Sequence, residues 1–228
     1  MARHKEFDRQ VVLEKAMETF WQYGYEGTSI QILLQAMGIN RGSLYDTFGD
    51  KRSLFLEAIA HYETKVVQEA IAKLEAPDAG KAAIIEHFQG VVERLASDRA
   101  RWGCFMTNVA VELCSHDAEA TNRIRQSLQR IEKAFRHALQ NAQNQGEVAS
   151  DADIAALACF LTCMIQGLRV MVKVDPNRQV LNQIINSTLS VLDTINPPGV
   201  VVKRCGDTGR TGRGDGELGE LNPPPSQG

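Results

Sequence analysis

The sequence has few cysteines and no long uncharged run, and these shortages exclude several classes of protein. Its five cysteines are an odd number without a Cys-x-x-Cys pair, so we expect reduced thiols and neither a disulfide nor a zinc framework. The histidines show no paired ligand spacing, so we expect no metal site, and we expect no cofactor. The longest run without a charge, residues 154–168, is shorter than the roughly 20 residues that span a bilayer. The N-terminus lacks the apolar core of a signal peptide. We therefore expect a cytoplasmic protein with no membrane partner.

An excess of positive charge is also missing. Lys and Arg number 25 against 28 Asp and Glu, a formal net charge of -3. Bulk charge therefore does not indicate nucleic-acid binding, and any DNA contact has to come from a local basic patch. The 228 residues are 43% hydrophobic and 23% charged, which is enough to bury a substantial core.

Hydrophobic residues recur with helical spacing over most of the chain. They predict helices from about residues 9–24, 29–37, 40–48, 51–74, 80–98, 102–114, 117–145, 151–173 and 177–195. Glycines at positions 24, 38, 49 and 146 are placed to end four of these helices. No alternating hydrophobic run bounded by turn residues predicts a strand. The sequence therefore predicts an all-α protein.

The C-terminal segment differs in composition from the rest. Residues 199–228 hold eight of the 18 glycines, and five of the seven prolines lie at or after Pro197, so we expect a disordered tail. The tail contains the pattern Gly-x-Gly-x-x-Gly at Gly214, Gly216 and Gly219. Prolines follow where a dinucleotide-binding motif requires a helix, which argues against a nucleotide site.

The predicted helices at 29–37 and 40–48 are separated by a tight turn at Gly38, as in a helix-turn-helix. The outer face of the second helix carries groups that can bind phosphates and base edges. These are Asn40, Arg41, Ser43, Tyr45 and Thr47, with Gly42 permitting close backbone approach. Arg41, Lys51 and Arg52 supply local positive charge, and residues 3–5 offer a basic arm. The sequence therefore predicts a DNA-contacting surface.

One set of residues runs in order and at a specific spacing through this region: Gly24, Tyr25, Thr28, Ser29, Gly38, Gly42, Leu44, Tyr45, Phe48 and Lys51. The set resembles the DNA-binding domain of the TetR family of bacterial one-component transcription regulators, over about residues 9–60. The resemblance implies that Thr28, Tyr45 and Lys51 contact phosphates. It also implies that Arg41, Gly42, Ser43 and Thr47 face the major groove.

The same resemblance implies a C-terminal helical domain that binds a ligand and dimerises through its last two helices. We therefore expect a helix-turn-helix DNA-binding domain at 1–56, a ligand-binding and dimerisation domain at 57–198 and a tail at 199–228. The expected partners are a small-molecule effector, a second copy of the chain and a palindromic double-stranded operator. Bulky and adaptable side chains are the candidate ligand contacts: Phe88, Trp102, Cys104, Phe105, Met106, Val109, Phe135, Met164 and Met171.

Cys104 has a second interpretation. It lies near a predicted helix start and follows Arg99 and Arg101, and both features favour a thiolate. The segment also resembles a TetR subgroup that includes regulators responding to reactive electrophiles. An inert buried thiol remains the alternative.

The leading hypothesis is a ligand-responsive DNA-binding transcriptional regulator, a repressor released from its operator by a small molecule, and not an enzyme. A thiol-based electrophile or oxidant sensor of the same fold, acting through Cys104, is the first alternative. A helical enzyme using Cys104 is a second, although no base is recognisable beside it. A helical interaction module without DNA binding is a third, with Asp46 as the residue that repels phosphate.

Overall fold

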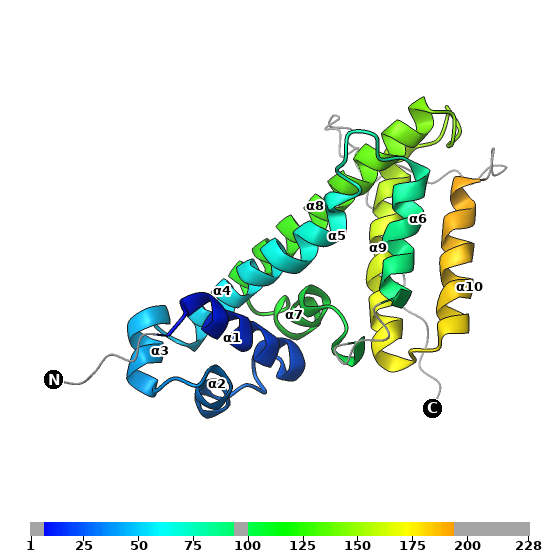
Figure 1. The fold of residues 1–228 in the computed structure, drawn as a ribbon. Helices are drawn as coiled ribbons and strands as arrows, with labels where there is room; N and C mark the ends of the chain where they lie inside the picture. Colours follow the sequence, from blue (N-terminus) through cyan, green and yellow to red (C-terminus); the bar gives the residue numbers. More distant parts are fainter. Residues whose placement is uncertain (1–6, 94–99, 194–228) are drawn as a thin grey trace, which may run out of the picture. The chain divides into compact units, whose positions relative to one another are not determined.

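A computed structural model of the chain describes residues 7–93 and 100–193. The expected tail at 199–228, the basic residues at 3–5, Arg99 and the last predicted turns at 94–98 and 194–195 lie outside the described residues. The helices are α1 (Arg9–Tyr23), α2 (Ile30–Met37), α3 (Arg41–Phe48), α4 (Lys51–Tyr62), α5 (Gln68–Ala72), α6 (Lys81–Glu93), α7 (Phe105–Leu113), α8 (Ala118–Asn144), α9 (Ile154–Val174) and α10 (Arg178–Leu189) (Figure 1). No strand occurs in these ranges, and the all-α prediction is confirmed.

Short irregular helices join some of these elements. A π-helical turn, Glu63–Val67, connects α4 to α5 inside the single helix predicted for 51–74. One 3-10 turn, Ala100–Trp102, precedes α7, and another, Ser190–Leu192, follows α10.

Local capping groups explain where the first helices begin and end. The Ser29 hydroxyl accepts from the Ile32 N–H at 3.2 Å, and the Asn40 side chain accepts from the Ser43 N–H at 2.8 Å. These bonds satisfy amides that have no partner within α2 and α3. Gly38 ends α2 at φ +72°, a left-handed conformation that favours glycine. The turn that sets α3 against α2 is therefore encoded locally.

The hydrophobic core is continuous from the N-terminal helices into α7. Helix α1 packs against α2 and α4, and α4 in turn contacts α7. The Phe55 ring of α4 lies 5.0 Å from the Phe20 ring of α1 and 6.0 Å from the Phe105 ring of α7, centroid to centroid. The Tyr62 ring is 5.5 Å from the Phe105 ring. Contacts of α8 with α7 and α9, and of α10 with α6 and α9, extend the helical packing.

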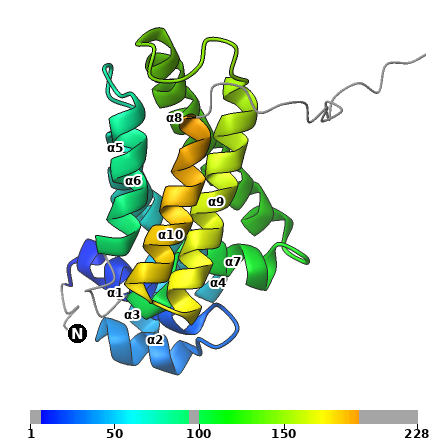
Figure 2. The same ribbon diagram turned by 90° about the vertical axis from the view of Figure 1, so that its right-hand side faces the viewer.

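Helix α9 has an exposed apolar face. By length and composition alone it is the one helix in the described ranges that is long and apolar enough to cross a membrane, and only 22% of its most apolar window is buried. The uncharged run counted in the sequence stops before Arg169, whereas the helix continues to Val174. Figure 2 shows α9 and α10 side by side on one face of the helical bundle. Small and apolar exposed residues recur along α9 at helical spacing: Ala156, Phe160, Cys163, Gly167, Val170 and Val174.

Candidate nucleic-acid interface

Helix α3 is anchored by two buried residues and presents polar groups outward. Leu44 is fully buried and Phe48 nearly so, while Arg41 and Tyr45 are exposed. Of the other predicted contacts, Asn40 and Gly42 are exposed, and Ser43 and Thr47 are partly buried. The side-chain amide oxygen of Asn40 caps α3, which fixes the start of the helix. Asp46 is exposed as well, so α3 presents a carboxylate beside Arg41 and Tyr45.

Lys51 is held beside α3 by an aromatic ring. Its ammonium lies 4.2 Å from the centroid of the Tyr25 ring, a cation–π contact. The Tyr25 ring packs in turn 4.7 Å from the Phe55 ring, centroid to centroid. Lys51 is also the first residue of α4, whose N-terminus is capped by Asp50. The ion pairs formed within the described ranges do not include Lys51, so its charge remains available for a phosphate.

Thr28 differs from the expectation of a phosphate contact. Its side chain is fully buried, and its hydroxyl donates to the Gly24 carbonyl at 2.6 Å. Its N–H donates to the Tyr25 carbonyl at 3.3 Å. A hydroxyl used in this way stabilises the turn between α1 and α2 and is not presented to a ligand.

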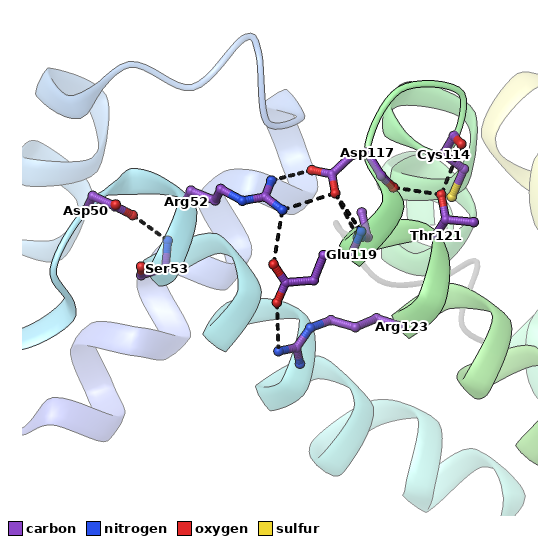
Figure 3. Close-up of polar contacts among 9 residues, drawn as sticks. Asp50, Arg52, Ser53, Cys114, Asp117, Glu119, Thr121 and Arg123 are labelled. Atoms are coloured by element: carbon purple, nitrogen blue, oxygen red, sulfur yellow. Dashed lines mark hydrogen bonds and ion pairs between the residues drawn. The ribbon is translucent and has the colours of Figure 1, made fainter.

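Arg52 also differs from the expected basic patch. Its guanidinium binds Asp117, which caps α8, and one of its nitrogens lies 3.1 Å from a carboxylate oxygen of Glu119 (Figure 3). Glu119 in turn lies 3.6 Å from Arg123. The bonds from Arg52 and from two backbone amides lower the pKa of Asp117 from 3.8 to about 2. Arg52 therefore ties α4 to α8 and does not add positive charge to the α3 surface.

A cavity of about 390 Å³ lies among the helices. Its lining is mixed, with aromatic rings at Trp21 and Tyr62, a guanidinium at Arg169, the sulfur of Cys104, and further charged groups at Glu69, Lys73, Glu86 and Glu93. A volume of this size fits a small organic molecule.

Of the nine predicted ligand contacts, only Cys104 lines this cavity. Five of the others are buried in the core: Phe88, Phe105, Met106, Val109 and Phe135. Trp102 and Met164 are partly buried, and Met171 is 37% exposed on α9. Bulky apolar residues at helical spacing serve the core as readily as a ligand site, so the pattern does not separate the two uses.

The Cys104 thiol is placed between two donors that sequence reasoning missed. The Tyr62 hydroxyl donates to its sulfur at 3.7 Å, and a guanidinium nitrogen of Arg169 donates at 3.7 Å. Burial opposes ionisation of this thiol, but the charge of Arg169 and donors from Thr107 and Tyr62 outweigh it, so the pKa of Cys104 is lowered from its usual 9.0. The cation predicted from sequence, Arg101, is exposed. The lowered pKa favours the thiolate, and Arg169 of α9 makes the largest contribution to that lowering.

Two family models match the chain. One, described as bacterial regulatory proteins, tetR family, matches residues 12–58. The other, described as tetracyclin repressor-like, C-terminal domain, matches residues 80–188.

Individual relatives agree with these matches. The uncharacterized HTH-type transcriptional regulator YezE of Bacillus subtilis is 41% identical over 85% of this chain and 100% of its own length. The HTH-type transcriptional repressor ComR of Escherichia coli is 31% identical over 82% of this chain and 90% of its own. Among solved structures, a cysteine-substituted form of the regulator CifR in complex with a 26-base-pair operator duplex superposes with a TM-score of 0.71 at 32% identity. That match covers 82% of this chain and 98% of CifR.

Proposed function

The chain belongs to the TetR family of bacterial transcription regulators, and on this premise we propose that it is a homodimeric repressor released from its operator by a small molecule. Family membership makes the chain a DNA-binding transcription regulator and not an enzyme. Repression is supported by the name of the ComR relative. Binding to a double-stranded operator is supported by the CifR complex with such a duplex.

The proposed DNA contact is carried by one observation, the exposed polar face of α3 beside the ammonium of Lys51. Arg41 and Tyr45 reach outward from a helix that Leu44 and Phe48 anchor in the core. An exposed guanidinium can bracket the O6 and N7 acceptors of guanine, and a lysine at a helix N-terminus binds phosphate. We place this DNA-binding domain at residues 1–56 and the ligand-binding and dimerisation domain at 57–198, with the effector in the cavity beside Cys104.

Dimerisation is supported by the apolar stripe on α9. Phe160, Val170 and Val174 are exposed by 38%, 44% and 76%, although each is a large hydrophobic residue. Helix α10 packs beside α9. A second copy related by twofold symmetry would cover this stripe as a four-helix bundle. Burial against a second copy would account for the length and apolar composition of α9 without a membrane.

The DNA contact is tested by the salt dependence of binding. A duplex selected from a random library with the wild-type protein is titrated in a mobility-shift assay at several salt concentrations. The slope of log K against log salt is negative, and Lys51→Ala is expected to reduce its magnitude by about 0.9 for each phosphate that the protein no longer neutralises. Lys133→Ala, which removes an exposed lysine from α8, is the matched control. Equal slopes for the two variants would contradict the proposal.

The position of Cys104 supports a second candidate, in which the effector reacts covalently. The thiolate would add to the β-carbon of a quinone or an unsaturated aldehyde, and the resulting enolate would take a proton from water. The adduct would displace the contacts that Tyr62 and Arg169 make with the sulfur. Because close-packed side chains surround the cavity, the added bulk would favour a different arrangement of the helices.

Thiol substitution separates the covalent effector from a reversible one. Under the covalent hypothesis, Cys104→Ser stays on the selected duplex when treated with a quinone, while wild type is released. Cys159→Ser removes an exposed thiol of α9 that is not among the residues of the apolar stripe, and it is expected to behave like wild type. Equal release of Cys104→Ser and wild type would leave a reversible ligand as the effector.

A further inference from the structure

Glu112, near the end of α7, holds the backbone of a distant turn. One of its carboxylate oxygens accepts from the Tyr25 N–H at 3.0 Å, and the other accepts from the Glu26 N–H at 2.8 Å. The two amides follow the C-terminus of α1, where Gly24 is the cap residue. Each carboxylate oxygen therefore takes one amide, and charged acceptors make the stronger hydrogen bonds. No pattern in the sequence pointed to this role for Glu112.

Gly24 has a backbone conformation and an environment that both favour glycine. Its φ is +76°, which favours glycine. A Cβ at this position would lie 2.8 Å from a carboxylate oxygen of Glu112, closer than atoms can pack. Gly24 is the first glycine of the motif that resembles the TetR family. Glycine at this position permits the turn, and it also permits the close approach of the Glu112 carboxylate.

The turn held by Glu112 carries the ring that holds Lys51. Tyr25 donates its N–H to Glu112, and its ring lies 4.2 Å from the Lys51 ammonium. The Tyr25 ring also packs against Phe55. Because the ring is attached to the Tyr25 backbone, a shift of that backbone would move the ring that the Lys51 ammonium contacts. The chain of contacts runs from Glu112 through Tyr25 to Lys51.

We propose that Glu112 is a positioning residue for DNA binding, which fixes Tyr25 and thereby the ammonium of Lys51 at a phosphate of the operator. This inference rests on the proposed function, because it takes Lys51 as a phosphate contact. Cys104, on the cavity wall, immediately precedes α7, and Glu112 lies in the last turn of that helix. The same short helix therefore connects the effector cavity to the residue that orients the phosphate contact.

A double-mutant cycle tests this role. Glu112→Gln keeps the size of the side chain but removes its charge and one of its two acceptors. Glu112→Gln alone is expected to weaken binding of the selected duplex about tenfold, or about 1.4 kcal/mol, and to lower the salt slope as Lys51→Ala does. In the Lys51→Ala background the same substitution is expected to change affinity less than about twofold, because residues acting through one contact are not additive.

Two further variants distinguish a positioning role of Glu112 from a general loss of folded protein. Tyr25→Leu leaves the backbone amide that binds Glu112 but removes the ring, and is expected to reproduce the decrease in salt slope. Glu132→Gln, which breaks an ion pair with Arg136 on the surface of α8, is the matched control and is expected to bind like wild type. Full additivity of Glu112→Gln with Lys51→Ala, or an unchanged slope in both Glu112→Gln and Tyr25→Leu, would overturn the positioning role. Absence of DNA binding by the wild type would instead overturn the proposed function.

Discussion

Removal of the charge on Asp117 is expected to loosen the connection between α4 and α8. The Asp117 carboxylate binds the Arg52 guanidinium and accepts from the Glu119 and Ala120 amides at 3.0 and 2.9 Å, capping α8. Asparagine is as good a helix cap as aspartate. Asp117→Asn therefore removes the ion pair and leaves the cap, so its effect reports the ion pair alone.

The magnitude follows from the lowered pKa. A shift from 3.8 to about 2 corresponds to about 2.5 kcal/mol if converted in full. Part of the shift comes from the Glu119 and Ala120 amides, for which asparagine remains an acceptor. Solvent also screens the pair, because the Asp117 side chain is 12% exposed and that of Arg52 is 41% exposed. We therefore expect stability to fall by about 1–2 kcal/mol, between the values typical of exposed and buried pairs. In a chain of this size that lowers the melting temperature by roughly 2–8 °C.

The pH dependence has a definite sign. The folded-state pKa of Asp117 lies below its unfolded value of 3.8, so its stabilisation is complete above that value. It is lost as the pH falls from 3.8 through about 2, where the folded-state carboxylate takes up its proton. The difference in stability between wild type and Asp117→Asn should therefore shrink over that acid range.

The assay is denaturant unfolding of both proteins at neutral pH and across the acid range. Asp153→Asn is the matched control. Asp153 caps α9 by accepting from the Ala155 and Ala156 amides at 3.0 and 3.1 Å. It forms none of the ion pairs found among the described residues. The control should unfold like wild type. Equal destabilisation by the two substitutions, or a difference that does not depend on pH, would refute the reasoning.

Two other predictions concern the α9 face and the cavity. Val170→Glu places a charge in the apolar stripe and is expected to yield monomers or aggregates, because an unpaired buried charge costs several kcal/mol. Light scattering measures the mass, and a monomeric mass for the wild-type protein would contradict the proposed dimer. Because Arg169 helps to hold the pKa of Cys104 below 9.0, the rate of alkylation of Cys104 by iodoacetamide should rise with pH at a lower midpoint in wild type than in Arg169→Gln. Identical midpoints would show that Arg169 does not stabilise the thiolate.

Local features of the sequence were enough to predict the helices and the α3 surface. The stop at Gly38 acts within one helical turn, so its effect is visible in the sequence itself. The caps that the structure shows at Ser29, Asn40 and Asp50 act over equally short spans. The spacing of apolar residues shows which face of each helix is buried, and Leu44 and Phe48 are buried as that spacing implies. The assignment of individual residues to DNA contacts remains a prediction.

Tertiary packing alone decided which charged and reactive groups meet. Arg52 finds Asp117 on α8, Glu112 finds the amides after α1, and Cys104 finds Arg169 on α9. These partners lie 65 to 87 positions apart in the chain, where periodicity carries no information about which side chains will touch. The cavity shows the same limit, because a bulky side chain at helical spacing fills a core or lines a pocket with the same sequence pattern. Only the packing of the helices determines which of these it does.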